Sequence, residues 1–599
     1  MSGRAIGVRD ALTYAPILHH AITADGLRVA AVSPRFDATT QSRRPRLYVR
    51  SLDGDEAWAE IGPEEARYHS PAWSPDGRLG AFRTWNDTSD VVVIDPSNPT
   101  DAGQGLTGMP AYAIALTWWG ESPKLACVGE DAEGVRRVWS WDDPTTGPRA
   151  VTPPKKRVGD FAFGFGSSAF AWLHAPARPV GGADPGTVLY VTTDLNKKPA
   201  AVAVPEPWIG FLAWSPDGQY LAGLARPTDE PLTQPRLWVL DVRREEAWRL
   251  LEDQSGWITG FDWRPDGQGL VVALEQGVAG RLYDVDLDGR ARPVGPVDSY
   301  LSGPRFDRAG GRMLFLRQDG DVPQHVRLLE PGGTQSVAVT RWHERLRTAT
   351  LHAAERVQWT APDGLEIEGL LMLPAAPNPP VVVWIHGGPA ENLQRTFSMH
   401  FQLLLANGWA VLAPNFRGST GRDDAFLQAI AGRVGVDDVT DVLAGVDALA
   451  DRIDPARVAF MGWSYGGSVA LGCAAARPTT RAVIAGAPVV DWLGAFGAWS
   501  WPWLTPRYFG PSPWVDPTPY DRASVIRKIA AVRSPTLFLH GEADDRVPVA
   551  QSRAAYRMLQ AGGVPTDLRV FPGEPHVFSA PWAVQEMLVR VVGWLKTHL

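Results

Sequence analysis

The stretch MGWSYGGS, at residues 461–468, decides the fold of this chain. It follows a short apolar run, residues 457–460, and precedes a run of small residues, 469–476, that suits a helix. The pattern predicts a strand, a sharp turn and a helix, with a G-x-S-x-G motif in the turn. Such a turn forces its central residue, Ser464, into a strained backbone conformation and exposes its hydroxyl. The two glycines of the motif leave room where a side chain would collide with the neighbouring strand or helix.

A serine alone is a poor nucleophile, so the motif needs a base and an acid that orients the base. Residues 535–539 read as a buried parallel strand that runs into Asp544 and Asp545. We choose Asp544 because it lies three residues after a glycine. Residues 568–571 read as another strand, and His576 follows it as the candidate base. Nucleophile, acid and histidine then occur in the chain order of an α/β-hydrolase.

Backbone amides for an oxyanion hole are predicted at two turns. Residues 381–385 read as a strand that ends in the turn HGGP at 386–389, which can offer one N–H. The N–H of Tyr465, directly after the candidate nucleophile, supplies the second. Each motif alone has an ordinary explanation, because G-x-S-x-G occurs by chance in glycine-rich proteins and a lone histidine is usually structural. Together, however, the HGGP turn, the serine motif, the acid and the histidine follow strand ends in the chain order of an α/β-hydrolase, and this combination favours a catalytic site.

The composition limits the class of protein. With 599 residues the chain is too long for one core, so we expect two domains or more. Its formal net charge of -8 argues against nucleic acid as a partner. No apolar stretch is long enough for a membrane span or an N-terminal signal, so we expect a cytoplasmic protein. The only cysteines, Cys127 and Cys473, lie far apart and suggest neither a disulfide nor a zinc site, and no metal or organic cofactor is implied.

The first half of the chain repeats one pattern at a spacing of about 50 residues. Its clearest copies, with the sequence W-S-P-D-G or W-R-P-D-G, lie at residues 73–77, 214–218 and 263–267. Because Pro-Asp-Gly is turn chemistry, each copy predicts a strand, a tight turn and a second strand. Weaker copies lie at residues 23–26, 117–120, 161–164 and 306–310. The repeat predicts an N-terminal seven-bladed β-propeller, with eight blades as the alternative, and makes many of the 26 Trp blade-packing residues.

The second half has a different pattern, so we place a domain boundary near residue 350. Residues 1–350 form the predicted β-propeller and residues 351–599 the predicted C-terminal α/β-hydrolase domain. Two strands at 356–360 and 367–374 read as an antiparallel pair, and alternating strands and helices follow them. The candidate catalytic residues stand at the carboxyl ends of strands, as in open α/β sheets. The propeller would cover the site and restrict access to small or unfolded substrates.

These motifs resemble the prolyl oligopeptidase family of serine peptidases, and most closely its acylaminoacyl-peptidase and dipeptidyl-peptidase branches. The matching pieces are HGGP at 386–389, NFRGS at 415–419, GWSYGG at 462–467, HGEADDRVP at 540–548 and Pro575-His576. Because this family joins a propeller to an α/β-hydrolase, the resemblance covers the whole chain. It implies Ser464, Asp544 and His576 as the catalytic triad, and the amides of Gly388 and Tyr465 as the oxyanion hole.

The resemblance also implies residues that bind the substrate. An arginine at the position of Arg546 often holds a substrate carbonyl in this family, although a salt bridge to Asp545 would explain this residue equally well. A Trp-rich segment after the strand that follows the elbow would line the pocket for the residue before the cleaved bond, or form a hydrophobic cap under the propeller. The pocket candidates are Val489, Trp492 and Trp499, and an aromatic wall would favour an apolar side chain there.

Two departures leave the type of exopeptidase open. Many family members begin with a helix that packs on the hydrolase domain, but the strand-like repeat begins here by residue 20, so that brace is short or absent. The dipeptidyl-peptidase branch holds a free substrate amine with paired glutamates from the propeller. The acidic pairs Glu64-Glu65 and Asp229-Glu230 are the candidates for that role.

The expected function is a serine exopeptidase of acylaminoacyl or dipeptidyl type, acting on short peptides with an apolar residue before the cleaved bond. An esterase or amidase for a non-peptide substrate is the alternative among enzymes, because the same triad cleaves esters. A propeller-based binding protein with an inactive hydrolase domain is the alternative from another class. The expected partner is a short peptide or small acyl substrate, without nucleic acid or membrane. A homo-oligomer is left open because hydrolase sheets often pair through edge strands.

Overall fold

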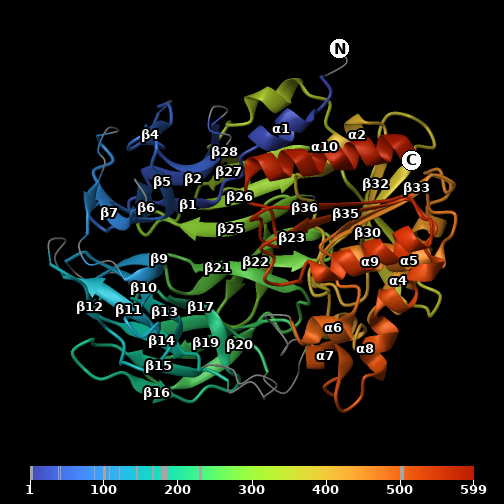
Figure 1. Cartoon of the computed structure of the whole chain (residues 1–599). Helices are drawn as coiled ribbons and strands as arrows, with labels where there is room; N and C mark the ends of the chain where they lie inside the picture. Colours follow the sequence, from blue (N-terminus) through green and yellow to red (C-terminus); the bar gives the residue numbers. More distant parts are fainter. Residues whose placement is uncertain are drawn as a thin grey trace.

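Seven four-stranded sheets and one eight-stranded sheet make up the described part of the chain in the computed structural model (Figure 1). The structure describes residues 4–599 except 38–39, 41, 55, 86–87, 99–100, 102, 107, 109, 121, 143–145, 165–166, 177–185, 228–231, 298 and 499–504. Figure 1 shows the small sheets, blue to green, on one side of the molecule and the large sheet, yellow to red, on the other.

Each of the seven small sheets is an antiparallel meander whose strands pair in chain order. Their strands are β1 (His19–Ile22), β2 (Arg28–Asp37), β3 (Ser42–Ser51) and β4 (Ala59–Ile61); β5 (Arg67–Trp73), β6 (Leu79–Trp85), β7 (Thr88–Ile94) and β8 (Gln104–Gly105); β9 (Ala111–Trp119), β10 (Lys124–Glu130), β11 (Arg136–Trp141) and β12 (Arg149–Ala150); β13 (Val158–Phe163), β14 (Phe170–His174), β15 (Val188–Thr192) and β16 (Ala200–Val202); β17 (Trp208–Trp214), β18 (Tyr220–Ala225), β19 (Arg236–Asp241) and β20 (Glu246–Leu250); β21 (Trp257–Trp263), β22 (Gly269–Gln276), β23 (Ala279–Asp286) and β24 (Ala291–Val294); and β25 (Tyr300–Phe306), β26 (Met313–Asp319), β27 (Val322–Leu329) and β28 (Ser336–Ala338). The prediction of a seven-bladed propeller is confirmed.

The tryptophan of the repeat joins four of the blades to the blade before them. The indole N–H of Trp263, at the end of β21, donates to the carbonyl of Ala213 in the preceding blade at 3.0 Å. Trp73, Trp118 and Trp214 donate to the preceding blade in the same way. A buried indole needs an acceptor for its N–H, and here the neighbouring blade supplies it. This explains physically why tryptophan recurs at this position.

The eight-stranded sheet has the order β29-β30-β32-β31-β33-β34-β35-β36. Its strands are β29 (Glu355–Thr360), β30 (Glu366–Met372), β31 (Val381–Ile385), β32 (Ala410–Asn415), β33 (Val458–Trp463), β34 (Ala482–Gly486), β35 (Thr536–Gly541) and β36 (Thr566–Phe571). β29 and β30 form the predicted antiparallel pair, and the strands from β31 onward run parallel to one another. The α/β-hydrolase prediction is confirmed.

Helices cover both faces of this sheet. The helices of the described chain are α1 (Val8–Thr13), α2 (Met399–Ala406), α3 (Asp424–Gln428), α4 (Asp437–Ala448), α5 (Tyr465–Ala476), α6 (Trp492–Phe496), α7 (Thr505–Phe509), α8 (Thr518–Ala523), α9 (Ala550–Ala561) and α10 (Pro581–His598). Alternate residues of one strand enter different cores because side chains alternate across a strand. Val381 and Val383 pack with α4, α5 and α9, whereas Val382 packs with α2 and α10.

The N-terminal brace is short, as the sequence predicted. Helix α1 has six residues and packs against α2 and α10, where Ala11 shares a cluster with Leu403 and Leu588. Figure 1 shows α1 beside α10. Cys127 and Cys473 are both buried and free. No helix of the described residues has the length and apolar character needed to cross a membrane.

Candidate active site

Ser464 occupies the sharp turn between β33 and α5. Its backbone has φ 59° and ψ -125°, a region that residues other than glycine rarely adopt. The chain passes so tightly here that a Cβ on Gly466 would lie 2.2 Å from the Ile385 carbonyl oxygen. A Cβ on Gly462 would lie 2.3 Å from the Gly466 backbone. The strained turn and the need for both glycines agree with the geometry predicted from the G-x-S-x-G motif.

His576 and Asp544 lie together on the loops after β36 and β35. His576 Nδ1 and Asp544 Oδ2 are 2.6 Å apart, and a carboxylate can only accept, so Nδ1 carries the proton and Nε2 is left as a base. Trp463, next to the serine, donates its indole N–H to the His576 carbonyl at 2.8 Å. Among the described residues, Ser464 Oγ makes no hydrogen bond to His576. Such bonds are often formed only when substrate binds.

The Asp544 carboxylate is held in its ionised form. Its Oδ1 accepts the backbone N–H groups of Arg546 and Val547, at 2.9 and 2.8 Å. Burial alone would raise the pKa of Asp544, but hydrogen bonds from His540 and His576 outweigh it and hold this pKa well below its usual value. An ionised carboxylate at this place keeps the imidazole of His576 in one orientation and stabilises its protonated form.

His540 is a supporting residue for which the sequence analysis proposed no role. Its Nε2 lies 2.9 Å from the Val547 carbonyl and 3.3 Å from Asp544 Oδ2. Because both partners only accept, Nε2 carries the proton, and Nδ1 can then accept from Ser552 Oγ at 2.7 Å. The fully buried His540 thereby fixes the loop that carries the acid. Its place at the start of HGEADDRVP, directly after a buried strand, was the only signal in the sequence for this role.

The HGGP turn lies against the elbow. A Cβ on Gly387 would be only 3.7 Å from Ser464 Cβ, and Gly388 has φ 101°. The ring of His386 stacks on Phe416 at 4.3 Å, and its Nε2 lies 2.8 Å from Ser419 Oγ. Burial lowers the pKa of His386 to about 4, so this ring is neutral at pH 7. The NFRGS motif thus supports the turn whose amide was predicted to face the oxyanion.

Tyr465 begins α5, so its N–H belongs to the first four of the helix, which have no partner within the helix. Its side chain points the other way and donates its hydroxyl to Asp438. Asp438 is fully buried, and this burial raises its pKa to about 6. The next acid on this face of α4, Asp441, accepts three hydrogen bonds from the side chain and backbone of Arg417. These contacts fix the helix behind the serine.

The predicted substrate-binding residues have different environments. Val489 and Trp492 are 2% and 3% exposed and belong to the hydrophobic core, where Trp492 packs on Phe509 at 5.0 Å. Burial of these two side chains is expected both for a core and for the wall of a substrate pocket, so their role in a pocket stays a prediction. Trp499 lies outside the described residues. Arg546 is exposed, and besides its bond to Asp544 its positive charge acts on Glu391.

The acidic pairs predicted to hold a substrate amine cannot both be placed. Glu64 is 74% exposed and lies 3.7 Å from Arg35, so a nearby cation already accompanies it. Asp229 and Glu230 lie outside the described residues. In the part of the chain that the structure describes, no group of three His, Cys, Asp or Glu side chains could hold a metal ion.

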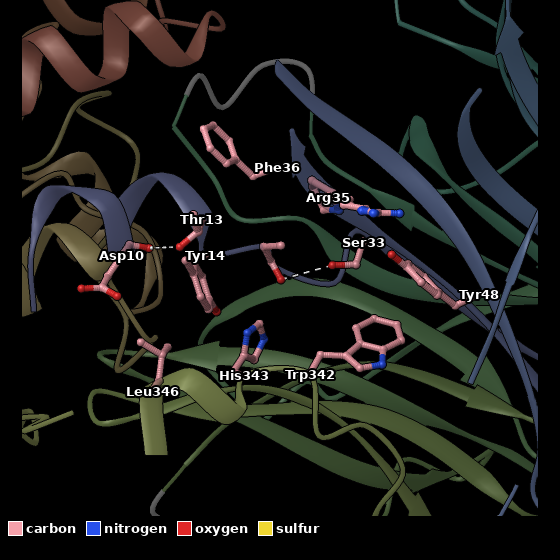
Figure 2. A pocket seen from close by; sticks show the side chains of 12 residues that line it. Asp10, Thr13, Tyr14, Ser33, Arg35, Phe36, Tyr48, Trp342, His343 and Leu346 are labelled. Carbon is pink, nitrogen blue, oxygen red and sulfur yellow. Dashed lines mark hydrogen bonds between the residues drawn. The ribbon is translucent and has the colours of Figure 1, made fainter. Parts of the chain in front are cut away.

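A cavity of 510 Å³ lies away from these residues (Figure 2). It is an open pocket between α1, β2, β3 and the segment before β29, and is lined by Asp10, Thr13, Tyr14, Ala15, Ser33, Pro34, Arg35, Phe36, Tyr48, Trp342, His343 and Leu346. Figure 2 shows the rings of Tyr14 and His343 side by side, and their centroids are 4.9 Å apart. None of the candidate catalytic residues lines this cavity, so it is separate from the site.

Comparisons with known proteins agree with this arrangement. Residues 395–599 match the model of the prolyl oligopeptidase family. The acylamino-acid-releasing enzyme of Homo sapiens is 30% identical over 374 residues, which cover 56% of this chain and 50% of that protein. The chain thus spans about half the length of the first curated relatives it matches. Dipeptidyl-peptidase 5 of Porphyromonas gingivalis is 22% identical over 98% of this chain and 94% of its own.

The fold is shared with a solved structure over its whole length. The acylaminoacyl peptidase of Pyrococcus horikoshii superimposes with a TM-score of 0.83, covering 99% of this chain and 98% of that one. The two sequences are 18% identical. At this identity the likeness shows the common propeller and hydrolase architecture, and the chemistry must be argued from the site itself.

Proposed function

We propose that this chain, whose hydrolase domain belongs to the prolyl oligopeptidase family, is a serine exopeptidase that cleaves short peptides. The observation that carries the proposal is the contact between Asp544 and His576 at 2.6 Å, on loops that reach the strained turn of Ser464. An oriented base near a partly exposed serine on such a turn is what nucleophilic catalysis requires.

In the proposed mechanism, Ser464 Oγ attacks the carbonyl carbon before the cleaved bond. His576 Nε2 takes the hydroxyl proton and then gives it to the leaving amine. The amides of Gly388 and Tyr465 hold the negative oxygen of the tetrahedral intermediate. Water then enters, His576 takes one of its protons, and the acyl group leaves Ser464. Throughout, Asp544 orients the ring and stabilises its protonated form.

The substrate class follows from the surroundings of the site and from the relatives. The Trp492 cluster next to the elbow favours an apolar side chain before the cleaved bond, because such a side chain gains by leaving water. The human relative is named an acylamino-acid-releasing enzyme, and the bacterial one a dipeptidyl-peptidase. We therefore propose exopeptidase action on a short peptide that fits beneath the propeller.

The direct test replaces Ser464 with Ala and measures hydrolysis of N-acetylphenylalanine p-nitroanilide and phenylalanine p-nitroanilide. The wild type should cleave at least one, and the variant should cleave neither while keeping its circular dichroism spectrum and melting temperature. A variant that retains peptidase activity would remove Ser464 from the mechanism. A fluorophosphonate probe should label the wild type at Ser464 and leave the variant unlabelled.

Two other functions give distinct results in this test. A non-peptide esterase or amidase would hydrolyse p-nitrophenyl esters through Ser464 and leave both anilides intact. A binding protein with an inactive hydrolase domain would not react with the fluorophosphonate at all. Nothing in the site favours either over the peptidase, since the acid, the base and the strained serine are all present.

A further inference from the structure

Glu391 places a carboxylate next to the reacting centre. It follows the HGGP turn, two residues beyond Pro389. A Cβ on Gly387 would lie 3.3 Å from Glu391 Oε2 and 3.7 Å from Ser464 Cβ, so one small volume separates the carboxylate from the nucleophile. The backbone of Glu391 is fixed at both ends, because its N–H donates to the Pro389 carbonyl at 2.9 Å and its carbonyl accepts from Thr420 at 3.0 Å.

The carboxylate of Glu391 has no hydrogen-bond donor among the residues that the structure describes. Burial raises the pKa of Glu391, and electrostatic interactions with Arg546 and His576 oppose that rise. The side chain nevertheless remains accessible to solvent. An exposed carboxylate that has no donor in the protein is available to bind a cationic group of a ligand. The acids Asp438 and Asp544, by contrast, are hydrogen-bonded to other residues of the protein.

The cation must come from a group close to the scissile carbonyl. The α-ammonium of a free N-terminal residue stands two bonds from its own carbonyl carbon, which matches a carboxylate so near Ser464 Cβ. A lysine ammonium stands six bonds away and would reach past it. An acetylated α-nitrogen is neutral and offers nothing to an ionised partner, so it leaves the carboxylate unpaired.

Resting on the proposed peptidase function, we propose that Glu391 binds the free α-ammonium of the residue whose carbonyl Ser464 attacks. The chain is then an aminopeptidase-type enzyme that releases single N-terminal residues and discriminates against N-acylated peptides. This assigns the amine-binding role to the oxyanion loop of the hydrolase domain rather than to acidic pairs on the propeller. Charge-assisted hydrogen bonds of this kind set both affinity and orientation.

The test measures kcat/KM on phenylalanine p-nitroanilide, its N-acetyl form and N-acetyllysine p-nitroanilide, for wild type, Glu391→Gln and Glu64→Gln. The Gln variant keeps the shape of the side chain and removes its charge. Losing a hydrogen bond to a charged group should lower kcat/KM on the free-amine substrate about 10- to 100-fold. The acetylated substrate should be cleaved by Glu391→Gln as it is by the wild type, and Glu64→Gln should match the wild type on all three.

Each other outcome overturns the assignment. An equal loss on free and acetylated substrates would make Glu391 a positioning residue of the turn. A loss confined to the lysine substrate would mean that the cation is a side chain, and loss of the free-amine preference in Glu64→Gln would return the role to the propeller. If kcat/KM of Glu391→Gln equals that of the wild type on every substrate, Glu391 does not bind the substrate.

The failure of the peptidase proposal can be recognised separately. If the anilides are not cleaved, phenylalanine methyl ester and its N-acetyl form repeat the comparison, because the same serine hydrolyses esters. An amine preference that depends on Glu391 would then survive while the peptidase function fails. If Ser464 does not react with a fluorophosphonate either, there is no acyl-transfer site and both proposals fail.

Discussion

Replacing Arg417 with Met should weaken the hydrolase domain far more than its distance from the reacting atoms suggests. The Arg417 side chain is 5% exposed and its guanidinium bonds Asp441, which is fully buried, as well as Asp363 and Asp437. Methionine keeps the apolar stem and removes the charge. Removing one partner of a buried ion pair lowers the free energy of unfolding by about 3–5 kcal/mol, because the other charge is left uncompensated.

This cost is large enough to measure as a melting temperature. For a domain of this size, about 1 kcal/mol corresponds to about 2–4 °C, so Arg417→Met should lower the hydrolase transition by about 6–20 °C in scanning calorimetry. Burial already raises the pKa of Asp441, and hydrogen bonds from Arg417 oppose that rise. Without the arginine, Asp441 can avoid its unpaired charge by taking up a proton. The loss should therefore be greater at pH 8 than at pH 5.5.

Arg433→Met is the matched control. Arg433 also forms an ion pair with Asp437, at 2.6 Å, but its side chain is 55% exposed. Exposed pairs contribute little, so this variant should melt within about 2 °C of the wild type. Equal melting temperatures for the two variants would contradict this role of the buried ion pairs. A decrease in melting temperature for Arg417→Met that does not grow with pH would contradict it as well.

Two further predictions test the acids of the site. Asp544→Asn should lower kcat about 10⁴-fold, because an amide selects the wrong tautomer of His576, whereas its neighbour Asp545→Asn should keep kcat near that of the wild type; similar losses in both would mean that the acid was assigned wrongly. Burial raises the pKa of Asp438 from its usual value of 3.8 to about 6, so its stabilising contribution is complete below pH 3.8 and is lost as the pH rises through 6. The melting temperature of the wild type, relative to Asp438→Asn, should therefore fall between pH 4 and 7, and a difference that is constant with pH would contradict the cause given for this pKa.

The parts of the fold that the sequence predicted are those set by short segments. The turn around Ser464 needs glycine on both sides, because a Cβ at Gly462 or Gly466 would lie within 2.2–2.3 Å of backbone atoms. The short motif around Ser464 therefore shows this requirement directly. The blades were recognised in the same way, since Pro-Asp-Gly forms the turn and Trp bonds the preceding blade. Local chemistry of this kind repeats, so a pattern reveals it.

Contacts between distant segments were beyond the reach of patterns. Glu391 and Ser464 approach each other only because the parallel strands β31 and β33 are neighbours. His540 was visible in a motif, but its bond to the Val547 carbonyl depends on how the following loop folds back. For Val489 and Trp492 the sequence had a different limit. It shows an apolar residue near the site, but the same residue type occurs in a pocket wall and in a core. The domain boundary near residue 350 and the oligomeric state remain predictions.

The propeller does more than cover the site, because one of its blades contacts the loops of the hydrolase domain near Ser464. The turn between β22 and β23 reaches into the hydrolase domain, where Val278 is 1% exposed and packs in the core beneath β30 and β32. The backbone N–H of Gly277 donates to Gly421 at 2.6 Å, and the Val278 carbonyl accepts from Arg395 at 2.8 Å. The second bond holds the loop that carries Glu391, and the first holds the neighbouring loop after β32, whose Thr420 N–H donates to the Glu391 carbonyl. A substrate amine bound there would thus be positioned by a blade of the propeller, although the carboxylate itself belongs to the hydrolase domain.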